Sequence, residues 1–222
     1  MPRIARTVIA GLPHHVTQRG NRRCDVFFDH QDRTAYLSWL SQYCRDNNVD
    51  ILAYCLMTNH VHLVLTPHTS DGLHRTLKPL HMRYSQRINR RQGWQGHLWQ
   101  GRFFSSALDD AYLWSAIRYV ETNPVRAGMA PRAELYPYSS AAAHCGLRED
   151  DLLTDSGIAV FDWSVWLSEK QNDEQLGILR RNTNKGLPSG SEKFVKILEC
   201  QENRKLAYRP QGRPRVKGLR PL

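Results

Sequence analysis

Hydrophobic positions in the N-terminal half of the chain alternate between a spacing of two residues and a spacing of three to four. The first spacing is typical of strands and the second of helices. The pattern predicts strands around residues 12–18, 50–57, 60–67 and 96–105, and helices over 32–48, 71–91 and 110–122. This order is typical of an α+β domain with a ferredoxin-like antiparallel sheet that has helices packed on one face.

The stretch from Ala53 to Pro67 is apolar apart from a break at residues 57–59 and two histidines. Successive side chains of a strand point to opposite faces, so His60 and His62 share one face while their apolar neighbours face a core. Two imidazoles on one face of a strand supply half of a metal site. The same pattern also occurs with purely structural histidines. Asn59 fits a tight turn between two strands.

Tyr119 and Asn123 lie four residues apart near the end of the third predicted helix, so one helical turn places them on the same side. If that side faces the histidine strand, a hard divalent cation held by His60, His62 and Asn123 would neutralise a phosphate while Tyr119 attacks it. A phenol ordinarily has a pKa of about 10. It therefore needs a nearby cation or base to be a nucleophile at neutral pH.

These residues also have structural interpretations. Tyr119 fits a core position, and Tyr112, two turns earlier on nearly the same face, is a rival nucleophile. Asn123 precedes Pro124 and fits a helix terminus. The coincidence of the histidine pair, the tyrosine and the four-residue step within one short domain favours a site.

Composition narrows the class of protein. The chain has 222 residues, 41% of them hydrophobic, which is enough for one sizeable domain with an appendage. A net charge of +10 predicts a polyanionic partner, with nucleic acid ahead of an anionic membrane surface. No apolar run is long enough to cross a bilayer and the N-terminus lacks an apolar signal core, so we expect a cytoplasmic protein. Five scattered cysteines without a Cys-x-x-Cys pair indicate reduced thiols.

The charge is distributed unevenly and predicts three regions. Residues 1–145 carry +7, residues 146–175 carry −6, and residues 176–222 carry +9. We interpret these as a basic catalytic domain, an acidic connecting segment that docks on the domain, and a basic C-terminal helix and tail. Arg213 and Arg215 lie in a stretch that resembles an AT-hook, which inserts into a narrow minor groove. The alternative is a disordered basic tail with phosphate affinity only.

Arginines mark candidate DNA-binding surfaces. Three of them follow the first predicted strand in a polar turn with Gly20 and Asn21 as its pivot, where they either hold phosphates or form a solvated loop. Two more lie four residues apart on the second predicted helix, in a region without acidic residues from 72 to 108. The full set of predicted DNA-binding residues is Arg19, Arg22, Arg23, Arg83, Arg87, Arg102, Arg213 and Arg215.

Several separated blocks resemble one family. His60-Val61-His62 is similar to the histidine-hydrophobe-histidine (HUH) motif of the single-tyrosine DNA-strand transferases. The wider text resembles the REP-associated tyrosine transposases over roughly residues 1–145. The blocks that carry the resemblance are His15–Asn21, Tyr54–His62, Leu98–Phe103 and Arg118–Ala127.

This resemblance implies a Mg²⁺- or Mn²⁺-dependent endonuclease and strand transferase for single-stranded DNA. Such enzymes recognise an imperfect palindromic hairpin with a short single-stranded motif at its foot. The nucleophile falls on Tyr119, which would become linked to a 5′ phosphate, the motif histidines fall on His60 and His62, and the third ligand falls on Asn123. That third position is a glutamine in some relatives.

The resemblance also sets expectations about partners and leaves alternatives open. We expect a REP-like palindrome as partner, a monomer or homodimer, no membrane partner, and a nucleoid-associated location. The first alternative is a hairpin DNA- or RNA-binding protein on the same fold that does not cleave. The second is a metal-dependent phosphodiesterase that activates water, which is disfavoured because the predicted pocket of His60, His62, Tyr119 and Asn123 offers no carboxylate as base.

Overall fold

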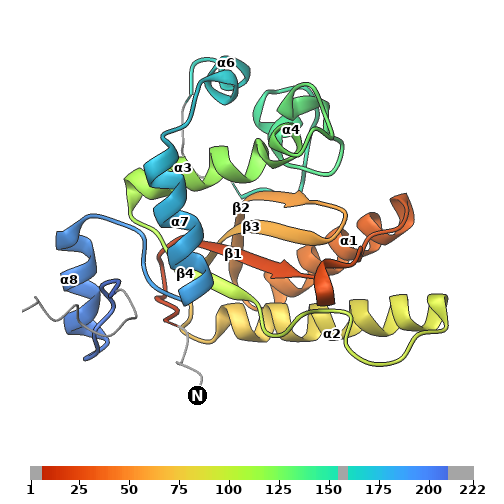
Figure 1. Cartoon of the computed structure of the whole chain (residues 1–222), viewed down its shortest axis with the longest axis horizontal. Coiled ribbons are helices and arrows are strands. Elements are labelled where there is room, and N and C mark those ends of the chain that lie inside the picture. Colours follow the sequence, from red (N-terminus) through yellow and green to blue (C-terminus); the bar gives the residue numbers. More distant parts are fainter. Residues whose placement is uncertain (1–6, 155–159, 210–222) are drawn as a thin grey trace, which may run out of the picture.

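The central element is a four-stranded antiparallel sheet, seen in the computed structural model, which describes residues 7–154 and 160–209 (Figure 1). The strands are β1 (His14–Arg19), β2 (Val49–Leu56), β3 (His60–Pro67) and β4 (Phe104–Ala107), in the order β2-β3-β1-β4. With the helices between them they give the ferredoxin-like fold that the sequence predicted. The prediction of a strand at residues 96–105 is wrong, because only Phe104–Ala107 pairs as a strand.

One face of the sheet is covered by α1 (His30–Asp46) and α2 (Gly72–Gln92). Asp29 caps α1 by accepting a hydrogen bond from the backbone N–H of Asp32, and Gly93 ends α2 with a left-handed φ of 67°. The apolar side chains at three- and four-residue steps along α2 form a fully buried stripe. Its members are Leu73, Leu77, Leu80, Tyr84 and Ile88.

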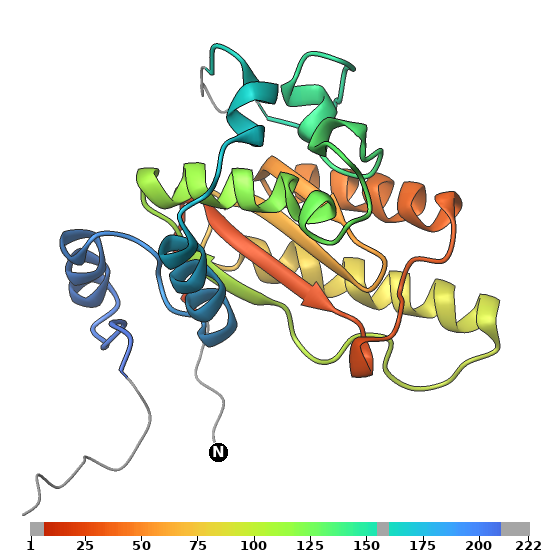
Figure 2. The same ribbon diagram turned by 45° about the horizontal axis from the view of Figure 1, so that its top comes forward.

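The other face is covered by α3 (Asp110–Glu121) and α7 (Asp173–Lys185), so helices lie on both faces rather than on one. Figure 2 shows α3 and α7 on the opposite side of the sheet from α2. The chain ends α3 at Glu121, close to the predicted end at residue 122. It turns directly into α4 (Asn123–Arg126), because proline is compatible with a first helical turn.

Shorter elements complete the described chain: η1 (Asn21–Arg23), η2 (Ala133–Leu135), α5 (Ala141–His144), α6 (Trp163–Ser168) and α8 (Glu192–Gln201). The acidic connecting segment does contact the domain, since Trp163 and Leu167 of α6 are buried in the same core as α3. In both views α8 lies at the margin, where Leu198 packs on the end of β4 at Ala107.

Some predictions remain predictions. Arg213 and Arg215 lie outside the described residues. The boundaries at 145 and 175 are not decided by the fold, although α7 runs across the second of them. None of the helices in the described ranges combines the length and hydropathy that crossing a bilayer requires.

Candidate functional site

The sheet brings the motif histidines to the face that carries α3 and α7. Val61, Leu63 and Leu65 point into the core on the α1 and α2 side, as the alternation predicted. His60 lies opposite Arg19, and His62 lies opposite Thr17, in the antiparallel register of β3 with β1. Directly opposed residues of two strands share one face, so these four side chains line the same surface.

The turn after β1 is held against the β2–β3 turn. The backbone N–H of Gly20 donates to the carbonyl of Asn59 at 2.9 Å, and a Cβ at Gly20 would come within 2.2 Å of the Cys24 carbonyl oxygen. Only glycine permits this approach. The predicted pivot is therefore a point of close packing, while the left-handed φ values in this turn belong to Arg22 (53°) and Arg23 (62°).

Asn59 determines which nitrogen of His60 carries the proton. The Asn59 amide nitrogen donates to the Arg23 carbonyl at 3.0 Å, so its amide oxygen faces Nδ1 of His60 at 2.6 Å. That oxygen can only accept, so Nδ1 carries the hydrogen and Nε2 keeps its lone pair. Burial, with a smaller contribution from the Arg19 charge, lowers the pKa of His60 to about 4. His60 is therefore a neutral imidazole at pH 7.

A third histidine, which we did not predict, lies beside the pair. Nε2 of His15 is 3.0 Å from Nδ1 of His62, and Nδ1 of His15 is 2.8 Å from the hydroxyl of Thr183. Burial lowers the pKa of His15 to about 3. Burial, followed by the neighbouring His60 and His15, lowers the pKa of His62 well below its usual value.

Tyr119 approaches the histidines from α3. Its ring centroid is 5.3 Å from that of His62 and 5.6 Å from that of His15, edge-on to both. The residue is 7% exposed and lines the same cavity as His60, His62 and Asn123. The structure thus brings together all four residues that we predicted from the two motifs.

Asn123 is fixed by its own helix. Its amide nitrogen donates to the carbonyl of Tyr119 at 2.9 Å, which turns the amide oxygen outward. That oxygen accepts a hydrogen bond from Arg126 at 2.9 Å. Because an amide oxygen has two lone pairs, it retains capacity for one further partner.

Two arginines that we did not predict contact the tyrosine. The guanidinium carbon of Arg126 lies 4.2 Å from the Tyr119 ring centroid, and that of Arg180 lies 5.1 Å from it. Arg126 is held by the Tyr119 carbonyl and by Thr122. Positive charge at this distance favours negative charge on a phenol oxygen and on a phosphate.

The cavity has a volume of about 400 Å³. Its walls come from β1, β3 and β4, from the α3–α4 junction, and from α7, which contributes Arg180, Thr183 and Asn184. Tyr112, the rival nucleophile, is not among the lining residues, and its pKa is raised chiefly by burial. The geometry therefore favours Tyr119 over Tyr112.

Protein side chains supply only part of the ligand set that a divalent cation would need at this site. Among the described residues, no group of three or more His, Cys, Asp or Glu side chains is arranged to hold a metal. The cavity offers Nε2 of His60, Nε2 of His62 and the amide oxygen of Asn123, which leaves positions for phosphate oxygens and water. This set suits a cation that is completed by its substrate.

Among the described residues, the predicted DNA-binding arginines lie in three places. Arg19 lines the cavity, and Arg22 and Arg23 follow it as exposed residues of η1. Arg83 and Arg87 lie on α2, across the sheet from the cavity. Arg102 is exposed in the loop before β4 but is not a lining residue.

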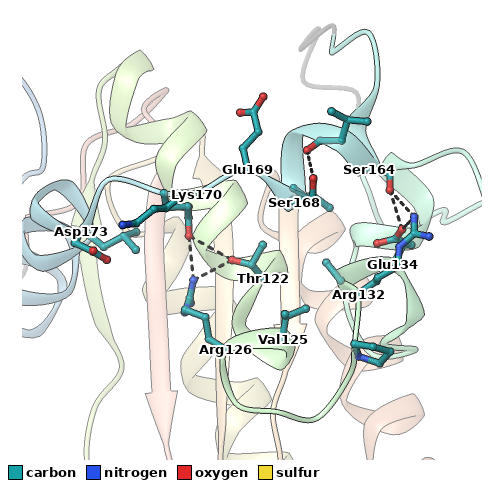
Figure 3. A pocket seen from close by; sticks show the side chains of 16 residues that line it. Thr122, Val125, Arg126, Arg132, Glu134, Ser164, Ser168, Glu169, Lys170 and Asp173 are labelled. Carbon is teal, nitrogen blue, oxygen red and sulfur yellow. Dashed lines mark hydrogen bonds and ion pairs between the residues drawn. The ribbon is translucent and has the colours of Figure 1, made fainter.

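A second cavity, of about 580 Å³, lies on the other side of Arg126 (Figure 3). Arg126 and Thr122 lie in the middle of this view, between Lys170 and Asp173 on one side and Arg132, Glu134 and Ser164 on the other. Its polar groups are largely paired with one another: Arg126 and Thr122 both donate to the side-chain oxygen of Gln171, and Ser164 donates to Glu134.

Comparison with known proteins identifies the family. Residues 9–123 match the family model described as "Transposase IS200 like", which is more than half of the chain. The chain belongs to the IS200-like transposase family. Within it, the chain is similar to a Haemophilus influenzae protein provisionally named a REP-associated tyrosine transposase, with 26% identity over 119 residues. That match covers 49% of this chain and 65% of the relative, and it confirms the resemblance seen in the motifs.

A solved structure supports the fold. The structure of a REP-associated tyrosine transposase bound to a REP hairpin aligns with a TM-score of 0.55 at 18% identity. The alignment covers 78% of this chain and all of the other. The shared α+β fold therefore extends beyond the residues of the family match.

Proposed function

We propose that the chain is a metal-dependent endonuclease and strand transferase for single-stranded DNA, acting at a palindromic hairpin. The observation that carries this proposal is the position of Tyr119, whose ring lies 5.3 Å from that of His62 in a cavity that His60 and Asn123 also line. A tyrosine, two neutral imidazoles and an amide oxygen around one cavity suit phosphoryl transfer to a phenol.

In the proposed reaction, the Tyr119 oxygen attacks the phosphorus of a phosphodiester. A tyrosine–phosphorus bond forms as the bond between phosphorus and the 3′ oxygen breaks. The phenol gives up its proton to water and the departing 3′ oxygen takes one up, so no net proton and no ATP are consumed. The products are a 5′-phosphotyrosine and a free 3′ hydroxyl, which can reverse the reaction or join another strand.

The chain's own residues support the charge that develops in this step. Arg126 and Arg180 lie within about 4–5 Å of the tyrosine ring, where they stabilise a phenolate and the attacked phosphate. His60, His62 and Asn123 would hold Mg²⁺ or Mn²⁺, and the cation would supply neutralisation of the phosphate oxygens. The buried imidazoles remain uncharged ligands because their pKa values lie below neutral pH.

The proposed substrate follows from two observations of different kinds. The solved relative with the same fold is bound to a REP hairpin. This chain carries a net charge of +10, which suits a polyanion. A DNA hairpin with a single-stranded foot would place a phosphodiester in the cavity while arginines around it contact neighbouring phosphates.

The test is covalent capture of labelled hairpin oligonucleotide in Mg²⁺ or Mn²⁺, resolved on denaturing gels. We expect a protein–DNA adduct with the wild-type chain and with Tyr112→Phe, and none with Tyr119→Phe, which should still bind the hairpin. Chelation of the metal should abolish the adduct.

Two other results would replace the proposal. Binding without cleavage by the wild-type chain would indicate the non-cleaving hairpin-binding protein. Cleavage that persists in Tyr119→Phe would indicate water as the nucleophile.

A further inference from the structure

His62 is connected to α7 by a short chain of buried hydrogen bonds. The chain runs from Nδ1 of His62 to Nε2 of His15 (3.0 Å), and from Nδ1 of His15 to the Thr183 hydroxyl (2.8 Å). The exposed fractions are 5%, 1% and 1% for His62, His15 and Thr183. The two imidazole planes are parallel within 2°, and their ring centroids lie 5.2 Å apart.

This chain has two possible directions, and they differ at the cavity. If the protons point toward Thr183, Nδ1 of His62 donates to His15, Nδ1 of His15 donates to the hydroxyl, and Nε2 of His62 presents a lone pair. If the protons point the other way, Thr183 donates to His15, His15 donates to His62, and Nε2 of His62 carries a hydrogen. Only the first arrangement allows Nε2 of His62 to bind a cation.

His60 does not have this ambiguity. Its Nδ1 faces the amide oxygen of Asn59, which can only accept, so the tautomer of His60 is set by a single neighbour. The partner of His62 is another imidazole, which can donate or accept. The tautomer of His62 therefore depends on what lies behind His15.

We propose that His15 and Thr183 are positioning residues that keep the proton of His62 on Nδ1 and its Nε2 lone pair in the cavity. This proposal rests on the proposed metal-dependent function. A hydrogen bond to the second ring nitrogen commonly fixes both the tautomer and the orientation of a metal-binding histidine. Here the buried path extends one residue further, to a hydroxyl.

Thr183 joins this series of hydrogen bonds to a helix that lies outside the family match. Thr183 lies on α7 (Asp173–Lys185), beyond the residues 9–123 of the family match, whereas His15 lies within them. Arg180 and Asn184 of the same helix also line the cavity. The helix α7 is thus a wall of the site that acts on His62 of the central sheet through His15.

The first test measures histidine tautomers in the metal-free protein by long-range ¹H–¹⁵N correlation spectra. We expect His15 and His62 of the wild-type chain to be protonated on Nδ1. In Thr183→Val, Nδ1–H of His15 would lose its acceptor, and a buried N–H without a partner is disfavoured. His15 and His62 should therefore shift toward Nε2–H. Thr183→Ser keeps the hydroxyl and should retain the wild-type spectrum.

The second test measures Mn²⁺ affinity by titration calorimetry without DNA. We expect a loss of about tenfold in Thr183→Val and of about 10–100-fold in His15→Phe, which is the usual range for partners of metal-binding histidines. Thr183→Ser should bind Mn²⁺ like the wild type, which separates the hydroxyl's role from packing. Thermal unfolding of each variant checks that it is folded.

We call the hydrogen-bonded series His62–His15–Thr183 the relay. The two tests separate failure of the relay from failure of the proposed function. Nε2–H on His62 in the wild-type protein, or an unchanged tautomer and affinity in Thr183→Val, would overturn the relay. A folded wild-type chain that binds no Mn²⁺ either without DNA or with hairpin DNA present would overturn the metal-dependent function, and the relay would then be judged by the tautomer spectra.

Discussion

His14 is a buried imidazole that makes the stability of this fold depend on pH. The side chain is fully buried, with Nδ1 donating to the Leu12 carbonyl (2.8 Å) and Nε2 accepting from the backbone N–H of Ile9 (3.2 Å). The bond from Ile9 requires the neutral ring, because Nε2 must keep its lone pair to accept it, whereas the bond to Leu12 can form in either protonation state. Burial lowers the pKa of His14 to about 4, although the bond to Leu12 opposes this shift.

We therefore predict that His14 makes the protein less stable in acid. Between about pH 6.5 and pH 4 the unfolded chain binds a proton at this position that the folded chain does not, so the free energy of unfolding falls as the pH falls. His14→Gln can keep both hydrogen bonds without titrating. Urea unfolding at pH 7 and pH 4 should show a drop that is smaller by up to about 3 kcal/mol in His14→Gln. The same change at the exposed His97 should leave the drop unaltered.

Residues that share a local pattern could be predicted from the sequence, and residues joined only by the fold could not. Strand alternation was sufficient for His60 and His62, and one helical turn was sufficient for Tyr119 and Asn123. His15 and Thr183 are 168 positions apart, and neither has a local feature that distinguishes it from a core residue. Arg126 could have been found from the sequence, because it lies seven residues, about two helical turns, after Tyr119.

At the scale of elements, Glu121 joins three helices at one buried carboxylate. Its oxygens accept hydrogen bonds from Ser140 just before α5, from His144 within α5, and from the indole N–H of Trp163 in α6. Glu121 is fully buried at the end of α3. The carboxylate thus holds the segments that follow the sheet domain against the helix that bears Tyr119.

Removing this carboxylate should destabilise the protein strongly. Glu121→Ala leaves three donors with unmet hydrogen bonds in a buried place, so we expect a loss of about 3 kcal/mol in the free energy of unfolding by urea titration. Glu121→Gln keeps one acceptor oxygen, so its free energy of unfolding should lie between those of the wild type and of Glu121→Ala. The exposed Glu149→Ala is the control and should change stability little. A loss in Glu121→Ala no larger than in Glu149→Ala would show that the network contributes nothing.

The one misassigned strand shows what hydrophobic spacing reports. Leu98, Trp99 and Phe103 are buried, but they anchor a loop, and the burial of both Leu98 and its neighbour Trp99 departs from strict alternation. The indole N–H of Trp99 donates to the His81 carbonyl of α2, and among these residues only a single bridge, between Trp99 and Gly20, joins the sheet pattern. Alternation therefore predicted neither the burial of Leu98 beside Trp99 nor the missing strand partner, because both depend on tertiary contacts.

At the scale of the whole molecule, basic side chains occupy both sides of the sheet. Arg22 and Arg23 follow the strand end that borders the cavity, whereas α2 presents Arg83 and Arg87 on the far side. Arg83 lies 4.3 Å over the ring of Trp39, and Arg87 is 3.7 Å from Asp32, which also binds Arg91. Arg91 also pairs with Asp29 at 2.7 Å, but α2 carries six Lys or Arg residues and no Asp or Glu, so this helix keeps excess positive charge.

This arrangement predicts that the two basic surfaces respond to different parts of the DNA. A short single strand should touch only the surface beside the cavity, so Arg22→Ala with Arg23→Ala should reduce the slope of log affinity against log salt by about 0.7 for each phosphate that the variant no longer neutralises. Arg83→Ala with Arg87→Ala should leave that slope unchanged.

On the full hairpin, the α2 double variant should also weaken binding and flatten the slope while leaving Mn²⁺ affinity intact, because a duplex stem is broad enough to reach past the edge of the sheet. Filter binding or fluorescence anisotropy at 50–300 mM salt, on the order of the range where this dependence is steep, measures both slopes. If the α2 variant has the wild-type slope on the hairpin, α2 does not bind DNA, and the protein holds its substrate from the cavity side alone.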